Sequence, residues 1–437
     1  MREITLAILG LGTVGQGVLH VLQENVHEIA EKAKAHFTIK WALVHDVQKT
    51  RPCLQTYPNL QLTTDFANIV HDPAVDIVIE LIGGTHPARE YMLQAMEEKK
   101  SVVTANKDVV AQFGKDMFAA AQANDVDFMF EASVGGGIPI IMPLKYSLAA
   151  NHITEMMGIV NGTTNYMLTR MAESGVSYDE ALREAQAKGY AEADPTADVA
   201  GLDAARKAAI LASIAFNTRI RLDDVSVEGI ASLTPADIDY AKALGYVVKL
   251  LAIGRDLGAR GVDVRVHPAF LPVEHPLAAV GGVFNAIYVR GNAVGEAMFY
   301  GQGAGSLPTA SAVVSDILEV SRDISLGTFG RMHCTCFENK PLCPLAETES
   351  SYYVRLLVDD RPGVLGAIAS AFGDKGVSLK SVIQTRRTGE SAEIVAITHV
   401  VRHYRIAAAK EALQALAVVR EVRSMIRVEP MQEGSEL

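Results

Sequence analysis

A glycine-rich motif, GLGTVG at residues 10–15, directly follows the first apolar segment of the chain. Residues 3–9 (EITLAIL) predict a short strand. After the motif, apolar residues recur at the four-residue spacing of a buried helix face, at Val14, Val18, Leu22 and Val26. The motif therefore lies where a strand turns into a helix. This context constrains the fold strongly, because such a turn is typical of the first βα unit of a doubly wound sheet.

The three glycines have separate roles in such a turn. Gly10 permits the tight turn, Gly12 lets the backbone approach a pyrophosphate, and Gly15 lets the helix pack closely on the strand. The helix N-terminus adds amide N–H groups and partial positive charge. The alternative is a glycine-rich turn that binds no ligand. Because a strand and a helix flank the motif, we expect an NAD(P) site formed by Gly10, Leu11, Gly12, Thr13, Val14 and Gly15.

The first third of the chain continues this alternation. Helical patterns follow Pro87 and extend from about residue 105 to 123. Further strands are predicted at residues 37–44, 75–82, 101–104 and 126–132. Repeated βα units predict a Rossmann-like, doubly wound parallel sheet. We expect this nucleotide-binding domain to span residues 1–135. The family resemblance given below implies that residues of about 300–330 complete it, because it places GQGAG at 301–305 by the cofactor.

The segment after the second predicted strand leaves the choice between NAD and NADP open. Asp46 is placed to hold the ribose hydroxyls, which favours NAD. His45, Lys49 and Arg51 are placed to attract a 2′-phosphate, which favours NADP. For each of these residues the alternative is a solvated charge on a loop.

Composition excludes several classes of protein. The formal net charge is −11, so no net positive field draws the chain to nucleic acid or to an anionic membrane. Four cysteines in 437 residues argue against a disulfide scaffold and for a reducing compartment. We find no signal-peptide pattern, and no apolar run reaches about 18 residues. We therefore expect a cytoplasmic protein whose partners are small molecules.

The pattern changes from about residue 135. Glycines cluster at 135–137 and 301–305, and Ala-rich helices are predicted at 178–188, at 199–216 and from about Pro308. Residues 136–300 are therefore set apart as a second region, for which the family resemblance given below implies an α+β domain for substrate binding and dimerisation. Residues 331–350 are polar and aperiodic, which predicts a linker. Residues 351–430 predict the order βαββαβ of a small ferredoxin-like domain.

Two segments carry candidate acid–base chemistry. Lys107 ends the motif TANK at 104–107, beyond the carboxyl end of a predicted strand, where ligands of such sheets bind. Asp203 and Lys207 share a helix face at i, i+4, and Glu192 lies on the preceding loop. A lysine beside a carboxylate can donate or accept a proton when burial lowers its pKa. The alternatives are an exposed lysine after a helix cap and a surface ion pair.

Seven motifs together make the chain similar to the homoserine dehydrogenase family over about its first 330 residues. The C-terminal unit resembles an ACT domain, a ligand-sensing module found on many members of that family. The motifs, in the order of the family, are GLGTVG (10–15), TANK (104–107), EASVGGGIP (131–139), NGTTNY (161–166), GYAEADP (189–195), GLDAARK (201–207) and GQGAGSLPTA (301–310).

The resemblance implies the reversible NAD(P)-linked reduction of L-aspartate 4-semialdehyde to L-homoserine, a step toward threonine and methionine. It implies that Lys207 exchanges the proton at the substrate oxygen and that Lys107, between cofactor and substrate, shares in this chemistry. Glu192 and Asp203 would bind the substrate, and Gly189 and Gly305 would line the cofactor side. The roles implied for the two lysines are chemically reasonable, because a nearby ammonium group stabilises the developing alkoxide. The sequence leaves open which lysine dominates.

Further roles follow from the resemblance alone. It implies a monovalent cation site, for Na⁺, held largely by backbone carbonyls of Glu131, Val134, Gly136 and Ile138. It implies threonine as the effector, bound at a domain–domain interface near Asp360, Arg361, Pro362 and Gly363. We expect a homodimer or homotetramer. The family often has an arginine where this chain has His45, which leaves the preference for NADP unsettled.

Three other interpretations stay open at the level of sequence. In the first, the ACT domain serves only to dimerise the enzyme. In the second the chain is another amino-acid or aldehyde dehydrogenase, and in the third it is an amino-acid-sensing regulatory protein with a vestigial Rossmann domain. The intact residues Lys207, Asp203 and Glu192 argue against the regulatory protein. A zinc cluster at His333, Cys334, Cys336 and Cys343 is disfavoured, because the C-x-C spacing is not a usual zinc pattern.

Overall fold

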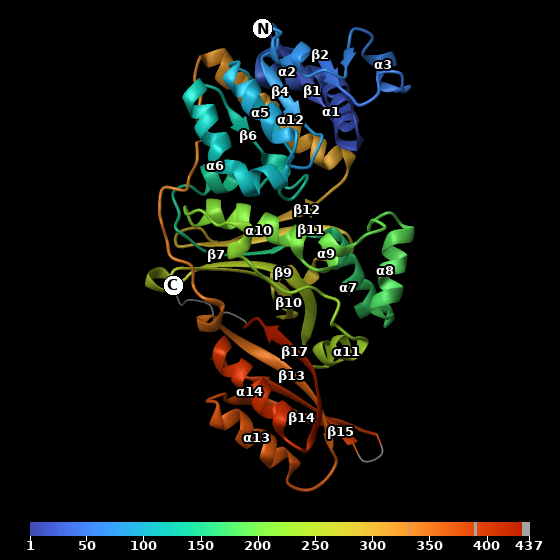
Figure 1. Cartoon of the computed structure of the whole chain (residues 1–437), viewed down its shortest axis with the longest axis vertical. Coiled ribbons are helices and arrows are strands. Elements are labelled where there is room, and N and C mark those ends of the chain that lie inside the picture. The colour runs from blue at the N-terminus through green and yellow to red at the C-terminus, as the bar shows by residue number, and fades with distance from the viewer. Residues whose placement is uncertain (332, 389–390, 431–437) are drawn as a thin grey trace. The chain divides into compact units, whose positions relative to one another are not determined.

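The computed structural model describes residues 1–331, 333–388 and 391–430 (Figure 1). The chain divides into two compact units. Unit 1 comprises Met1–Met156, Arg206–Val225 and Phe284–Asn339, and unit 2 comprises Met157–Ala205, Ser226–Val283 and Lys340–Leu437. Each unit is therefore assembled from segments that lie far apart in the sequence. None of the helices in the described ranges has the length and apolar character needed to cross a membrane.

A six-stranded parallel sheet forms the centre of unit 1. Its strand order is β3-β2-β1-β4-β5-β6, which is the order of a Rossmann sheet, so the predicted fold class is confirmed. Strands β4 and β5 are buried along their whole length, as expected of parallel strands covered on both faces. The strands are β1 (Arg2–Leu9), β2 (Ala35–Leu43), β3 (Gln61–Thr63), β4 (Ile77–Glu80), β5 (Ser101–Thr104) and β6 (Phe128–Met129).

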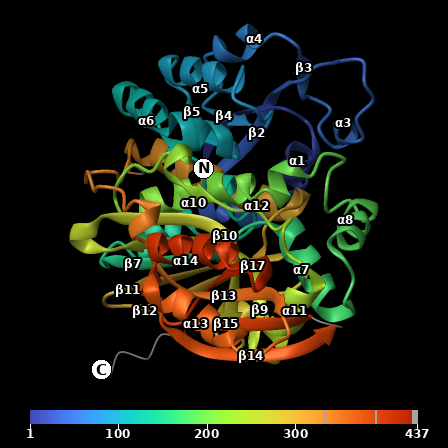
Figure 2. The same ribbon diagram turned by 60° about the horizontal axis from the view of Figure 1, so that its bottom comes forward.

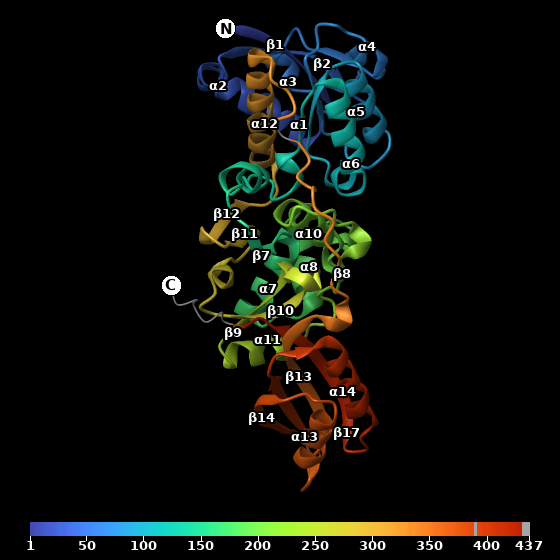
Figure 3. The same cartoon turned by 90° about the vertical axis from the view of Figure 1, so that its left-hand side faces the viewer.

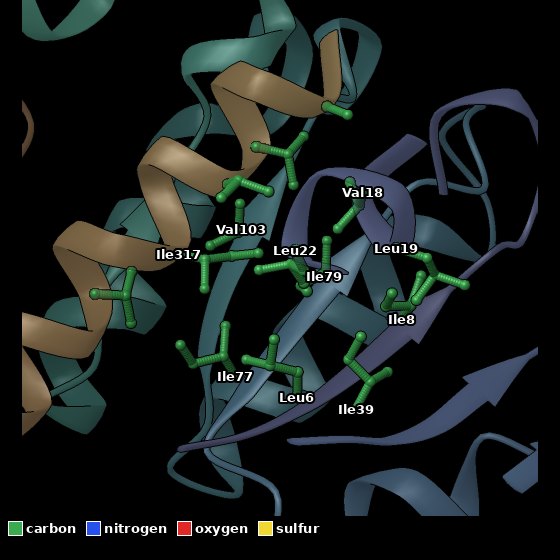
Figure 4. Close-up of a cluster of buried hydrophobic side chains, with 14 of the residues drawn as sticks. Leu6, Ile8, Val18, Leu19, Leu22, Ile39, Ile77, Ile79, Val103 and Ile317 are labelled. Atoms are coloured by element: carbon green, nitrogen blue, oxygen red, sulfur yellow. The ribbon is translucent and has the colours of Figure 1, made fainter. Parts of the chain in front are cut away.

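Helices from distant parts of the sequence cover this sheet. Helix α12 (Ser306–Leu326) packs beside α1 (Thr13–Glu24), which precedes it by almost three hundred residues (Figure 3). Ile317 of α12 joins Leu6, Val18 and Ile79 in one buried apolar cluster (Figure 4). The other helices are α2 (Val26–Ala33), α3 (Cys53–Thr56), α4 (Ala67–Val70), α5 (Ala88–Glu97) and α6 (Lys107–Asn124).

A hairpin of β11 (Phe284–Gly291) and β12 (Gly295–Gln302) leads into α12. β11 is largely buried, whereas β12 alternates between exposed and half-buried residues. Met298 and Tyr300 are among its exposed side chains. Two of the positions at which the chain passes from one unit to the other fall within an element. One lies in strand β7 (Ile153–Ile159) and one in helix α10 (Leu202–Ala215).

Unit 2 contains a long antiparallel hairpin of β9 (Tyr246–Asp256) and β10 (Val262–Pro272), with the short strand β8 (Ser226–Val227) beside β10. A single helix was predicted over 199–216, but the structure shows two. Helix α9 (Thr196–Val199) ends before Gly201, and α10 starts after it. Gly201 has φ +82°, which a continuing helix does not permit. The helices are α7 (Gly162–Ser174), α8 (Tyr178–Ala187), α9 (Thr196–Val199) and α11 (Pro235–Ala243).

The C-terminal part of unit 2 confirms the predicted βαββαβ arrangement. Its sheet order is β17-β13-β15-β14, and α13 and α14 lie next to each other on one face (Figure 2). Alternate residues of β13 from Tyr352 to Val358 contact these helices. The elements are β13 (Glu349–Asp359), α13 (Val364–Asp374), β14 (Leu379–Thr388), β15 (Ser391–Thr398), β16 (Val401–Arg402), α14 (His403–Ala415) and β17 (Val419–Val428).

This small domain is not held by a linker alone. β17 pairs in parallel with β10 at Ala269–Arg427 and Phe270–Val428, so one sheet continues from the β9–β10 hairpin into the βαββαβ unit. The segment 331–350 is also paired. Glu338 donates its N–H to Asn217 O within unit 1, and Val262 donates its N–H to Pro341 O within unit 2.

Candidate active site

The first glycine motif forms a turn between β1 and α1 that only glycine satisfies at two positions. Gly10 has φ +103°, and a Cβ on Gly15 would lie 2.1 Å from the carbonyl oxygen of Gly10. Gly12 differs, because a Cβ there would meet nothing within 4 Å. Gly12 is also the N-cap of the 12-residue helix α1 and offers no capping side chain. The first amides of α1 are thus arranged as an anion-binding helix N-terminus beside an open backbone.

The second glycine segment lies against this turn. The Ser306 hydroxyl donates a hydrogen bond to Thr13 O at 2.7 Å. A Cβ on Gly17 would lie 2.7 Å from Ser306 O, so α1 and the start of α12 approach each other closely. Gly305 has φ +128° and is the N-cap of α12. The structure therefore brings Ser306, directly after the second glycine segment, against α1 and the first glycine motif within unit 1.

Lys107 and Lys207 line one cavity of unit 1, with a volume of about 250 Å³. Lys107 is the first residue of α6, and Lys207 lies in the part of α10 that belongs to unit 1. Arg206 Nε lies 2.8 Å from Asp108 Oδ1, an ion pair that joins these two helix segments beside the lysines. The other walls are largely main chain and small side chains, including Gly83, Ser133, Gly135, Gly136 and Gly303. The cavity is therefore lined by two lysines and by glycine backbone.

A buried carboxylate positions the TANK motif. Glu80, fully buried at the end of β4, accepts the Thr104 hydroxyl at 2.6 Å and the amides of Ile82 and Gly83 at 2.8 and 3.1 Å. Thr104 in turn accepts the N–H of Asn106, whose side chain caps α6 by accepting the N–H of Val109. Sequence reasoning missed Glu80, although an acid ending a fully apolar strand is an available signal. The network fixes the direction in which α6 presents Lys107.

The predicted substrate ligands belong to unit 2. Asp203 is buried and accepts a hydrogen bond from Asn161 Nδ2 at 3.0 Å. The same amide nitrogen lies 2.7 Å from Asp198 Oδ1. Glu192 is exposed, and its backbone carbonyl accepts from Gln186. Asn161 and Asp198 are polar partners that sequence reasoning had not assigned, although Asn161 opens the motif NGTTNY. Gly189, with φ +73°, follows α8.

The loop that was predicted to hold a monovalent cation is organised by Glu131. Its carboxylate accepts the amides of Ile140, Ile141 and Met142 at 2.6 to 2.8 Å. Burial raises the pKa of Glu131, although these three hydrogen bonds act to lower it. Its N–H donates to Asp316, whose pKa is raised by burial and by the nearby Glu131 carboxyl. Since the carboxylate already has three partners, a cation at Glu131, Val134, Gly136 and Ile138 would be coordinated by main-chain oxygens.

The loop after β2 is exposed from His45 to Thr50. Asp46 Oδ1 accepts the N–H of Gln48 at 2.8 Å, and Arg51 Nη2 donates to Asp46 O at 2.9 Å. The candidate residues for the ribose or the 2′-phosphate, Asp46, Lys49 and Arg51, therefore lie together at the carboxyl end of β2. They include both an acid and two bases, so this geometry favours neither cofactor.

The predicted effector turn lies between β13 and α13. Asp360 accepts from Gln384 at 3.3 Å, and Arg361 is exposed, 3.5 Å from Asp359. Pro362 and Gly363 are also exposed, and Gly363, with φ +90°, is the N-cap of α13. Over the described ranges, no group of three or more His, Cys, Asp or Glu side chains is arranged to hold a metal ion.

Comparison with known proteins extends over nearly the whole chain. Residues 10–131 match the family model "Homoserine dehydrogenase, NAD binding domain", residues 139–318 match "Homoserine dehydrogenase", and residues 352–418 match "ACT domain". A homoserine dehydrogenase of Bacillus subtilis is 44% identical over 431 residues, covering 98% of this chain and 99% of the relative.

Two solved structures are informative. A homoserine dehydrogenase from Thiobacillus denitrificans superposes with a TM-score of 0.92 at 42% identity, covering 98% of this chain and 99% of that one. A hyperthermophilic archaeal homoserine dehydrogenase, solved in complex with NADPH, has a TM-score of 0.60 at 26% identity. It covers 73% of this chain and 98% of that one.

Proposed function

Because the chain belongs to the homoserine dehydrogenase family, whose members are NAD(P)-dependent oxidoreductases, we propose a division of roles among its residues. The reaction is the reversible reduction of L-aspartate 4-semialdehyde to L-homoserine. The observation that supports the proposed roles best is the cavity shared by Lys107 and Lys207. Aldehyde reduction needs a proton at oxygen, and two ammonium groups line the space where it is needed.

The residues of unit 1 suit a dinucleotide. The open backbone at Gly12 and the uncapped N-terminus of α1 would hold the pyrophosphate, with Leu11, Thr13, Val14 and Gly15 shaping the turn. Gly305 and Lys107 complete the proposed cofactor side within unit 1, and the resemblance to the family adds Gly189. The nicotinamide, when bound, supplies or accepts the hydride. Binding of NADPH by the archaeal relative supports NADP as one cofactor, and NAD stays the alternative.

Lys207 is proposed to exchange the proton at the substrate oxygen, with Lys107 stabilising the developing alkoxide. We expect Lys207→Ala to lower kcat by about 10²- to 10⁴-fold, the range typical of a lost general acid. NADPH binding, followed by fluorescence, should change little. Lys115→Ala, which alters an exposed lysine further along α6, is the matched control and should keep wild-type kcat. A near-normal kcat in Lys207→Ala would reject this role.

Glu192 and Asp203 are proposed to bind the ammonium end of the substrate. Asp203 suits this role because its carboxylate is buried and already oriented by Asn161. Asp203→Asn should therefore raise KM for homoserine more than it lowers kcat. An unchanged KM with a strongly lowered kcat would instead assign Asp203 to the chemical step.

A monovalent cation, Na⁺, is proposed in the loop of Glu131, Val134, Gly136 and Ile138. The buried Ser133 hydroxyl in this loop has no hydrogen-bond partner in the structure, which supports a polar occupant. Ion competition can test the site, because replacing Na⁺ with a bulky organic cation should lower thermal stability and activity together.

The ACT domain is proposed to bind L-threonine near Asp360, Arg361, Pro362 and Gly363 and to inhibit the enzyme. Support comes from the exposed glycine turn at the N-terminus of α13, with the polar pair Asp360–Gln384 beside it. Activity measured against threonine concentration tests this directly. Full activity at millimolar threonine would leave the ACT domain a structural role only.

We also propose that the enzyme works as a homodimer or homotetramer in the cytoplasm. The exposed apolar side chains of β12, Met298 and Tyr300, support self-association. The four cysteines are free thiols, which is consistent with a reducing compartment. Light scattering of the purified chain would measure the oligomeric state, and a monomer at micromolar concentration would contradict the proposal.

A further inference from the structure

Two cysteines separated by one residue lie half-buried on unit 1, in a cationic environment that the proposed reaction does not use. Arg219 Nη2 approaches Cys334 Sγ at 3.6 Å. Lys145 Nζ donates to the carbonyl of the preceding residue, His333, at 2.7 Å and lies 4.6 Å from the ring centre of Phe118. Cys336 Sγ lies 3.8 Å from Ser213 O. Both sulfurs are free thiols.

This environment favours the thiolate of one cysteine only. A hydrogen bond from Cys336, together with the charges of Arg219 and Lys145, lowers the pKa of Cys334 to about 5, although burial opposes this. The same hydrogen bond and burial raise the pKa of Cys336. Burial lowers the pKa of Lys145 to about 8, so its ammonium group is still largely protonated at neutral pH. The surroundings therefore favour a thiolate at Cys334 beside a thiol at Cys336.

The two cysteines also differ in the cavities that they line. A small cavity, of about 40 Å³, is lined by both Cys334 and Cys336. A larger groove, of about 620 Å³, is lined by Cys334 but not by Cys336. The larger groove also carries Lys115, Arg219 and His333, opposed by one acid, Asp125. A reagent in the larger groove thus meets Cys334 and not Cys336, and an anionic reagent is favoured there.

We propose that Cys334 and Cys336 form a thiol–disulfide exchange site for a small, negatively charged disulfide that enters through the larger groove. The Cys334 thiolate attacks one sulfur of the disulfide, forms a mixed disulfide and releases one thiolate. Cys336 gives its proton to that leaving thiolate. Its sulfur then attacks Cys334, forms the Cys334–Cys336 disulfide and releases a second thiolate. The dithiol loses two electrons, and the small disulfide gains them.

Peptide mapping by mass spectrometry of the full-length chain, incubated with oxidised glutathione, tests the assignment of roles. The wild-type chain should lose two hydrogens across Cys334 and Cys336. Cys336→Ser should instead accumulate one glutathionyl group on Cys334, and Cys334→Ser should leave residue 336 unmodified. Glutathione found on Cys336 but not on Cys334, or no reaction at either sulfur, would overturn the proposal. The wild-type measurement alone suffices if either variant fails to fold.

Rates give an independent test, with Cys343 as the internal control because burial raises the pKa of its thiol. Because the pKa of Cys334 is lowered and that of Cys343 is raised, Cys334 holds more thiolate at pH 6, so we expect it to react about tenfold faster than Cys343 although its thiolate is less nucleophilic. The rate at Cys334 should also rise less steeply from pH 6 to 8 than the rate at Cys343. The ratio of the rate with oxidised glutathione to the rate with the cationic disulfide cystamine should also be higher at Cys334 than at Cys343. Equal rates at the two cysteines, or a preference for cystamine, would reject the proposal.

Discussion

Two glycines of the same motif have different physical reasons to be glycine. Gly15 is required by the fold, because its Cβ would collide with the carbonyl of Gly10 at 2.1 Å. Gly12 is not required by the fold, because space is open around it and its backbone, with φ −78°, suits any residue. The fingerprint in the sequence treats both alike, and only the structure separates packing from ligand approach.

We therefore predict opposite phenotypes for two alanine variants. Gly15→Ala should lower the melting temperature of the chain, since overpacking costs about 1–3 kcal/mol. Gly12→Ala should melt like the wild type but bind NADPH about tenfold more weakly, a loss near 1.4 kcal/mol. Differential scanning fluorimetry with and without NADPH measures both quantities. Equal destabilisation by the two substitutions would contradict this distinction.

At the level of elements, a buried ionic network joins β13 of the ACT domain to α11. Arg355 donates to Asp237 at 2.9 Å and to Glu393 at 3.0 Å, and Glu393 also accepts from Tyr240 and Arg423. These partners lie on the face of the ACT sheet opposite to α13 and α14. Burial favours the neutral form of Glu393, but the hydrogen bonds outweigh it and lower its pKa below the ordinary 4.5.

This shift predicts a pH-dependent contribution to stability. Because the pKa of Glu393 is lower in the folded state, its contribution is complete above pH 4.5 and is lost as the pH falls through the lowered pKa. Glu393→Gln should therefore destabilise the chain at pH 7, by about 1.5–3 kcal/mol for a hydrogen bond to a charged group, and less at acidic pH.

Thermal unfolding from pH 7 down to pH 3 measures this difference. Glu421→Gln is the matched control, since Glu421 is exposed and also lies near Arg423. It should change the melting temperature little at any pH. A difference between Glu393→Gln and wild type that does not shrink in acid would show that the charge of Glu393 is not the cause.

At the scale of the molecule, the ACT domain is part of unit 2 and not a separable tail. Its strand β17 pairs with β10, whose residues are all buried, and Tyr353 stacks near Phe270 with ring centres 4.5 Å apart. Removing the domain would expose the edge of β10 together with apolar side chains that it now covers.

We predict that deleting residues 351–437 lowers the melting temperature and promotes aggregation. An Arg361→Ala variant, which alters only an exposed residue of the effector turn, is the control and should keep the wild-type melting temperature. Both are measured by fluorimetry and light scattering. A truncated chain that stays monodisperse with an unchanged melting temperature would show that the domain is attached by its linker alone.

Much of the fold and the family were predictable from the sequence, because the patterns that indicate them lie in neighbouring residues. The parallel sheet, the βαββαβ order and the family follow from hydrophobic periodicity and from motifs that each lie within about ten residues. Short elements were missed, such as β3, which has three residues and only one buried side chain. The break between α9 and α10 was missed because an isolated glycine in a helical pattern is usually tolerated. The roles of Glu192, Asp203, the cation loop and the effector turn stay predictions.

By itself, the sequence determined which chemical groups are present and which fold class they occupy, because motifs and periodicity are encoded in neighbouring residues. Only the tertiary structure decided which distant groups meet. It placed Lys107 beside Lys207 in one cavity, Ser306 against the first glycine turn, and Arg219 and Lys145 around Cys334. These contacts join segments a hundred or more residues apart, and the properties that follow from them, such as burial and a shifted pKa, have no local signature in the sequence.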